Sequence, residues 1–203
     1  MVTPSAQSSS SIAAVLNAAQ KRFFKFGFRA VTMDDLAADL GMSKKTLYAN
    51  FHSKRELLEA VLHRKIAEIA ANLDKIANDA NLNLLAKVYG LIDSLVSEVS
   101  AIKPPLIRDM QRDVPGLFAD IDAVRGEILP RYFGKLFAEG RRAGLIRSDL
   151  ESNIVIQMLI IAVQAIVRPE NIERLEITPG EAYRTVLTVM IEGILTEEGR
   201  KIV

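Results

Sequence analysis

Apolar residues recur at intervals of three and four along most of the chain, the spacing that places side chains on one face of an α-helix. Between Ser11 and Gly27, for example, Ile12, Val15 and Phe23 share one face. The same spacing returns in later segments, at residues 54–76, 84–102, 106–114, 117–143, 154–167 and 179–194. Together with two short segments near residue 40, these predict an all-α protein of about nine helices.

A helix-turn-helix is predicted early in the chain. Thr32 followed three residues later by Asp35 is a capping box, which starts a helix. Gly41 ends that helix because glycine tolerates the left-handed backbone of a sharp exit. Ser43 can then cap a second helix that begins at Lys44. Two short helices separated by so tight a turn are typical of this motif.

The second helix of the motif has one apolar and one polar face. Leu47 and Phe51 stand four residues apart and are expected to pack on the first helix. The side chains expected to point away are Lys44, Lys45, Thr46, Tyr48 and Asn50. Lysines in the first turn of a helix suit a bound anion, because a helix N-terminus on its own prefers acidic side chains. We interpret this face as one that contacts DNA.

A long helix follows the motif and divides the chain. Ser53 and Glu56 form another expected capping box, so this helix begins near Lys54. We expect it to join an N-terminal three-helix DNA-binding domain to a C-terminal helical domain. The predicted division is a disordered arm at residues 1–10, the DNA-binding domain at 11–53 and the helical domain at 54–203. Residues 1–10 are not expected to be a signal peptide, since they lack an early charge and an apolar core.

The run from Thr32 to Leu58, TMDDLAADLGMSKKTLYANFHSKRELL, resembles the DNA-binding signature of the tetracycline-repressor (TetR) family of bacterial transcription regulators. Recognisable residues cover 12–60, and the remainder is similar only in length and helical layout. The positions that match the family's DNA contacts are Thr32, Ser43, Lys44, Lys45, Thr46, Tyr48 and Lys54. Asn50 and Lys45 depart from the residues common in the family, so the resemblance implies no base preference for either.

The expected contacts divide by their chemistry. Lys44 and Thr46, with Lys45 as a third candidate, are expected to read base edges, lysine reaching guanine O6 and N7. Contacts that set the register through phosphates are expected from Thr32, Ser43, Tyr48, Asn50 and Lys54.

Net charge is +1, but it is unevenly distributed. Residues 1–60 hold eight Lys/Arg and five Asp/Glu, whereas residues 61–203 hold eighteen and twenty. This modest excess supports the motif without being evidence for DNA binding by itself. The chain has no cysteine, which suits a reducing cytoplasm and excludes thiol ligands and nucleophiles.

An enzyme is not expected. His52 and His63 are the only histidines, and neither stands in a metal-binding spacing such as HExxH. There is no Gly-rich phosphate loop and no nucleophile elbow of the GxSxG kind. We therefore expect no catalytic residues, no metal site and no cofactor.

The last two long helices indicate a subunit interface. Residues 154–167 are apolar on nearly every face, so this helix is expected to be buried on two sides, yet it is too short to span a bilayer. The helix at 179–194 has one strongly apolar face. Two such helices from each copy can form a four-helix bundle in a homodimer, as the resemblance also implies. No contact with a membrane is expected.

The family resemblance also implies a cavity in the helical domain for a small-molecule effector, with a largely apolar lining. Its candidate lining residues are Leu91, Leu95, Phe133, Phe137 and Met158. The same side chains at helical spacing are also typical of a solid core. In the segment 106–114, Arg108, Asp109, Arg112 and Asp113 are expected to form surface ion pairs at helical spacing.

The resulting hypothesis is a homodimeric, cytoplasmic transcriptional regulator, in the first instance a repressor released from a palindromic operator by an effector. Two alternatives stay open. The chain could bind DNA as a structural protein without an effector, or it could be a helical module that binds a ligand or a partner.

Overall fold

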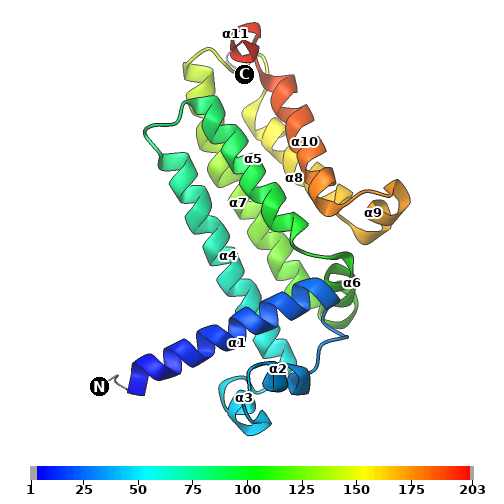
Figure 1. Cartoon of the computed structure of the whole chain (residues 1–203). Coiled ribbons are helices and arrows are strands. Elements are labelled where there is room, and N and C mark those ends of the chain that lie inside the picture. Colours follow the sequence, from blue (N-terminus) through cyan, green and yellow to red (C-terminus); the bar gives the residue numbers. More distant parts are fainter. Residues whose placement is uncertain (1–3, 202–203) are drawn as a thin grey trace. The chain divides into compact units, whose positions relative to one another are not determined.

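A computed structural model describes residues 4–201, and for residues 4–10, 125, 129 and 169 it describes the backbone alone. The described chain forms eleven helices and no named β-strand (Figure 1). In order they are α1 (Pro4–Phe26), α2 (Met33–Asp39), α3 (Lys44–Asn50), α4 (Lys54–Asn78), α5 (Leu84–Ser100), α6 (Pro104–Asp113), α7 (Pro115–Arg142), α8 (Ser152–Ile166), α9 (Pro169–Leu175), α10 (Pro179–Ile194) and α11 (Glu197–Arg200). The all-α prediction is confirmed, with the short α9 and α11 in addition to the helices expected.

The first helix begins earlier than the apolar pattern indicated. Helical backbone starts at Pro4, where an arm had been expected through residue 10, and residues 1–3 lie outside the described part. Proline is favoured in the first turn of a helix, and no glycine interrupts the chain before Gly27. The apolar spacing, which begins at Ile12, is therefore a poor marker of where α1 starts.

The helices divide into two compact units. One contains the chain up to Ala67 together with Ala101–Phe118, and the other contains Glu68–Ser100 and the chain from Ala119 onward. The start of α4 and the whole of α6 thus belong to the first unit. The sequence had suggested a single division at residue 54, because a return of the chain to the first unit leaves no mark in the local pattern.

The first unit packs around apolar side chains of its helices. Val15, Ala19 and Phe23 of α1 are fully buried, as are Leu36 of α2 and Leu47 of α3. This confirms the predicted apolar faces of α1 and of α3, the second helix of the helix-turn-helix. Removing such side chains from water is the main source of stability for so small a unit.

The helix α6 is held on the end of α1. Gly27 has φ +89°, and a Cβ there would lie 2.6 Å from Oδ2 of Asp109 and 3.1 Å from Cβ of Pro105, so only glycine allows this approach. Arg29 donates its backbone N–H to Asp109 at 2.8 Å, and its Nε lies 3.4 Å from Asp113. Both carboxylates thus contact Arg29. They had been expected to pair only within their own helix.

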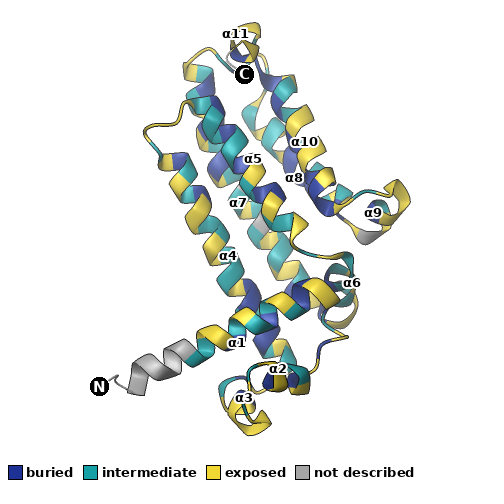
Figure 2. Ribbon diagram, viewed as in Figure 1, coloured by how far each residue is buried: buried dark blue, intermediate teal, exposed yellow. Residues whose placement is uncertain are grey.

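The second unit is built from the end of α4, most of α7, and α5, α8, α9, α10 and α11. Helix α10 packs against both α5 and α8, and Figure 2 shows buried and exposed positions alternating along it. The hydroxyl groups of two tyrosines form hydrogen bonds at the edge of this core. Tyr89 donates to Glu192 at 2.9 Å, and Tyr132 donates to the carbonyl of Ala70 at 3.0 Å.

Helix α8 differs from its prediction. Only one side of it is covered in the single chain: Leu159 and Val163 are buried. Ile154, Met158 and Ile161 are 60%, 54% and 62% exposed. The prediction that α8 is buried on two sides is therefore wrong for the isolated chain.

In the part of the chain that the structure describes, none of the helices combines the length and apolarity needed to cross a membrane.

Candidate nucleic-acid interface

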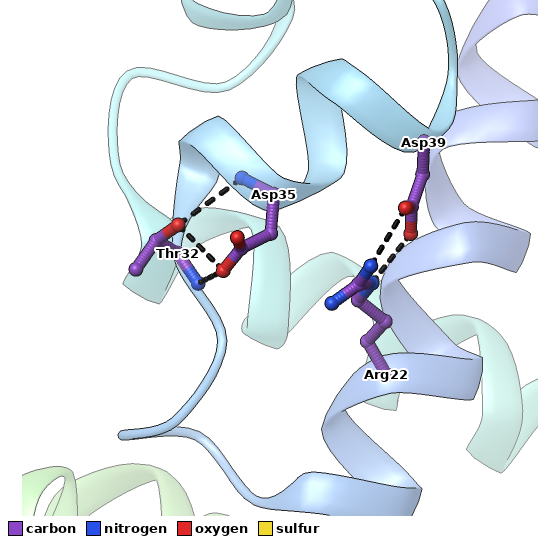
Figure 3. A network of polar contacts seen from close by, with 4 residues as sticks. All are labelled: Arg22, Thr32, Asp35 and Asp39. Atoms are coloured by element: carbon purple, nitrogen blue, oxygen red, sulfur yellow. Dashed lines mark hydrogen bonds and ion pairs between the residues drawn. The ribbon is translucent and has the colours of Figure 1, made fainter.

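The start of α2 is fixed by a reciprocal cap. Thr32 Oγ1 accepts from the Asp35 N–H at 3.1 Å, and the Thr32 N–H donates to Asp35 Oδ2 at 3.0 Å (Figure 3). The Thr32 hydroxyl also donates to the same carboxylate at 2.7 Å. These bonds from the Thr32 hydroxyl and N–H hold the pKa of Asp35 below its ordinary value. The predicted capping box is confirmed, and Thr32 itself is exposed.

The other end of α2 is tied to α1 by an ion pair. Both Nε and Nη2 of Arg22 bond to the carboxylate of Asp39, Nη2 at 2.6 Å from Oδ1 (Figure 3). The hydrogen bonds from the guanidinium lower the pKa of Asp39. Sequence reasoning missed this pair, because the two residues are 17 positions apart and no local pattern joins them.

The turn between α2 and α3 has the geometry that the motif needs. Gly41 has φ +61°, and its N–H donates to the carbonyl of Ala38 at 3.1 Å. Ser43 then caps α3, since its Oγ accepts from the Thr46 N–H at 3.1 Å. The hydroxyls of Ser43 and Thr46 lie 2.8 Å apart. Gly41 and Ser43 therefore play the predicted parts, and both hydroxyls are exposed at the start of α3.

Helix α3 buries one side and exposes the other. Leu47 is fully buried within the unit, whereas Tyr48 is 45% exposed. The exposed residues of the helix include Lys44, Lys45, Thr46 and Tyr48, and Asn50 is half-buried. The Asn50 side-chain amide donates to the carbonyl of Thr46 at 2.8 Å. The structure thus exposes four of the side chains predicted for DNA, whereas the amide of Asn50 is turned back onto its own helix.

Lys44 has an acidic neighbour on the preceding helix. Its Nζ pairs with Oδ2 of Asp34, and both side chains are more than half exposed. Exposed pairs of this kind contribute little to stability, about 0–1 kcal/mol. The ammonium can therefore leave Asp34 for a stronger acceptor at small cost.

Lys54 is only partly exposed, whereas a lysine that contacted nothing but a phosphate would be exposed in the free protein. Its Nζ donates to the carbonyls of Phe28 at 2.8 Å and Val31 at 3.0 Å, and it lies 4.3 Å from the centre of the Phe28 ring. Burial lowers its pKa below the ordinary lysine value. These contacts fasten the start of α4 to the loop that leads into α2.

The expected capping box at the start of α4 forms in a modified way. Ser53 Oγ accepts from the Glu56 N–H at 3.0 Å, as predicted. The Glu56 carboxylate, however, accepts from the N–H of His52 at 2.7 Å, one residue earlier than the pattern indicated. Its Oε2 also lies 3.2 Å from Nδ1 of His52.

The candidate effector residues lie mainly in the core of the second unit. Phe133 and Phe137 line a cavity of about 30 Å³, and Leu91 and Leu95 line a second gap, also bordered by Phe133, that is too tight for water. A volume of this size is about that of one water molecule. Met158 lines neither of these two spaces and is 54% exposed, so its part in an effector pocket stays a prediction. It lies on the uncovered side of α8.

Comparisons by sequence point to one family. The family profile described as "Bacterial regulatory proteins, tetR family" matches residues 15–61. The chain is 30% identical over 167 residues to the HTH-type transcriptional regulator YvaF of Bacillus subtilis (strain 168), covering 82% of this chain and 87% of YvaF. It is 24% identical over 179 residues to the HTH-type transcriptional repressor DhaR of Mycobacterium sp. (strain GP1), covering 85% of this chain and 86% of DhaR.

A comparison of folds agrees with these relatives. A TetR transcription regulator from Haloarcula marismortui ATCC 43049 matches with a TM-score of 0.72 over 93% of this chain and 100% of that one, at 16% identity. The profile covers the helix-turn-helix, and the likeness to YvaF extends over most of both chains. The chain thus belongs to the TetR family of DNA-binding, helix-turn-helix transcriptional regulators, which are not enzymes.

Proposed function

We propose that this regulator is a cytoplasmic homodimer that represses transcription from a palindromic operator and leaves it when a small molecule binds. One observation carries the proposal. The exposed side of α3 presents Lys44, Lys45, Thr46 and Tyr48, while Leu47 anchors the opposite side in the core. A short helix presented in this way fits the major groove, and the name of DhaR supports repression.

Within this interface we assign Lys44 and Thr46 to base edges, with Lys45 as a third reader. The side chains assigned to phosphates are Thr32, Ser43, Tyr48, Asn50 and Lys54. An ammonium has three N–H donors, and Lys54 uses two on backbone carbonyls. The third is available to a phosphate.

The dimer is proposed to form through α8 and α10. Ile154, Met158 and Ile161 follow one another at helical spacing and form an exposed apolar stripe on α8. Val189 of α10 is 64% exposed. A second copy of the same surface would cover these side chains in an isologous four-helix bundle, which gives a protein symmetry that matches a palindrome.

The proposed effector is a largely apolar small molecule, because the spaces bordered by Phe133 are lined by apolar side chains. Sites for such molecules usually measure about 300–1,000 Å³, so the second unit must open around the small cavity to admit one. Helices α4 and α7 each contribute residues to both units, so two continuous helices connect them. An effector that weakens operator binding tenfold must itself bind the operator complex tenfold more weakly, a coupling of about 1.4 kcal/mol.

A second candidate function is DNA binding without an effector. The small volume of the cavity favours it, since about 30 Å³ admits no more than water as the chain stands. The two functions separate in one measurement: only the first predicts a small molecule that lowers operator affinity.

The test is a footprinting assay with purified protein on DNA from around its own coding region, at two salt concentrations and with random DNA as competitor. We expect protection of a palindrome that weakens as salt rises. Lys44→Ala should change the preferred sequence, and Lys75→Ala, an exposed lysine on α4, is the matched control. Binding that stays nonspecific at both salt concentrations would refute the interface.

A further inference from the structure

A second basic surface lies in the first unit, in an open groove beside α1 with a volume of about 510 Å³. Its lining residues are Gln20, Lys21, Phe24 and Lys25 of α1, and Ala101 and Lys103 from the segment that leads into α6. We propose that this groove binds a small-molecule anion, a phosphate monoester with an apolar group. The volume falls in the range of about 300–1,000 Å³ that is usual for small-molecule sites.

The groove lies away from the side of α1 that packs in the core. Phe23 is fully buried, and Lys21 and Lys25 stand two residues before and after it. Two residues correspond to a rotation of about 200° around a helix. The two lysines therefore project from the side of α1 opposite its core side, while α3 packs into that core through Leu47. The groove is thus a site distinct from the DNA-contacting surface of α3.

Its charge is uncompensated. Lys21, Lys25 and Lys103 are exposed, none of the lining residues is acidic, and among the described residues none of the three has an ion pair. The Nζ of Lys25 lies 4.9 Å from the centre of the Phe26 ring, a contact that leaves its charge in place. Three positive charges around one hollow create a potential that attracts anions, and most of all a dianion.

Some cations elsewhere on the same unit have acidic partners. Arg22 pairs with Asp39, and Arg55 Nε lies 2.9 Å from Glu59. A surface that evolved only for solubility would mix both signs around this groove as well. The lining of the groove contains three lysines and no acidic residue.

The floor of the groove is apolar. Its apolar lining residues are Phe24, which is only 6% exposed, and Ala101. Gln20 is already engaged, because its Oε1 accepts from Arg64 Nη2 at 2.9 Å. The lining offers a ligand charge at the rim and apolar contact below, so a bare inorganic ion would use only half of it.

A ligand in this groove would add a link between α1 and residues 101–103, which one backbone hydrogen bond already connects. The Lys103 N–H donates to the carbonyl of Phe24 at 3.1 Å. A phosphate held by Lys103 and by Lys21 or Lys25 would bridge the same two segments through side chains. The three ammonium groups come together only when the first unit is folded. A ligand that binds them should therefore raise the stability of this unit. This inference does not rest on the proposed operator or effector.

Isothermal titration calorimetry on the full chain tests the inference with 1-naphthyl phosphate as the probe. Arms with 1-naphthoate, inorganic phosphate and neutral 1-naphthol distinguish a phosphate from a carboxylate, from the headgroup alone and from apolar binding. We expect 1-naphthyl phosphate to bind most tightly and to weaken as salt rises. Replacing one lysine by glutamine should weaken it about two- to fivefold, and replacing all three about tenfold or more.

The matched control is Lys75→Gln, which removes one exposed lysine outside the groove. Equal loss in this control, equal binding of 1-naphthol, or unchanged binding in the triple variant would overturn the inference. Amide NMR shifts of the wild-type chain give a readout that needs no variant. Shifts confined to residues 20–25 and 101–103 support the site, and shifts elsewhere overturn it. Competition by random duplex DNA would instead assign the groove to a DNA surface and would also overturn it.

Discussion

The ammonium of Lys54 lies against Phe28, 4.3 Å from the centre of its ring and 2.8 Å from its carbonyl oxygen. Lys54 opens α4, whereas Phe28 lies in the loop just before α2. The side chain of Lys54, on the helix that follows the helix-turn-helix, therefore holds the loop that precedes the motif. The lowered pKa of Lys54 has the same origin, because the contacts that hold the ammonium also partly remove it from water.

Replacing Lys54 by methionine should destabilise the chain by about 1–2 kcal/mol, because the Phe28 and Val31 carbonyls lose their donor. It should also weaken binding to all DNA sequences alike. Urea unfolding and DNA titrations measure the two effects, with Lys75→Met as the control for losing an exposed lysine. A changed sequence preference would contradict the assignment of Lys54 to phosphate and loop positioning.

Gly41→Ala should cost about 1–2 kcal/mol through backbone conformation alone. Gly41 has φ +61°, and a Cβ there would meet no atom within 4 Å, so steric overlap plays no part. Gly116 has equally open space but no positive φ, and it lies in the first turn of α7 in the same unit. Gly116→Ala should therefore be neutral or stabilising by about 0.5–1 kcal/mol. Equal unfolding midpoints for the two variants would refute this reading of the turn.

Two capping boxes should make stability depend on acid pH. One is the Thr32–Asp35 box of α2, and the other is formed by Thr178 and Glu181 at the start of α10. Hydrogen bonds from the two threonines lower the pKa values of Asp35 and Glu181 below 3.8 and 4.5, so their stabilisation is present above those values. It is lost as pH falls through the lowered pKa values. We expect the free energy of unfolding to drop less steeply below about pH 5 in Asp35→Asn and Glu181→Gln than in the wild type. Identical slopes in acid titrations of all three chains would show that the caps contribute no pH dependence.

The proposed dimer predicts that Ile161→Glu yields monomers. Ile161 is 62% exposed on the apolar stripe of α8, and a carboxylate there would be buried without a partner in the bundle. Leu175→Glu on α9 is the control, since Leu175 is also exposed and apolar but lies on neither α8 nor α10. Sedimentation analysis measures the result. A monomeric wild type, or a variant that stays dimeric, would contradict the interface.

The local features of the helix-turn-helix could be predicted because they depend on neighbours in sequence. Thr32 and Asp35 are three residues apart, and so are Ser43 and Thr46. Over such a short distance the side chain and the backbone group that it caps meet whenever the helix forms. The positive φ of Gly41 follows in the same way from a turn that few other residues tolerate.

Contacts between distant residues could not be predicted. Arg22 and Asp39 are 17 positions apart, and Arg29 and Asp109 are 80 apart, so only the packed unit brings them together. Burial is ambiguous for a related reason. An apolar side chain such as Met158 follows the same spacing whether it faces the core of its own chain or another surface. The pattern alone therefore could not show that Met158 is 54% exposed in the single chain.

The first unit consists of two separate stretches of the chain, so its parts are synthesised at different times. Helix α6 belongs to that unit, although the chain between Ala67 and Ala101 does not. On the ribosome, α1 to α3 are translated before Asp109 and Asp113, so Arg29 has no partner on α6 until these residues follow. A nascent chain stopped at Ala67 would carry the whole recognition helix but lack part of the unit that supports it. The DNA-binding unit is complete only once Phe118 has emerged.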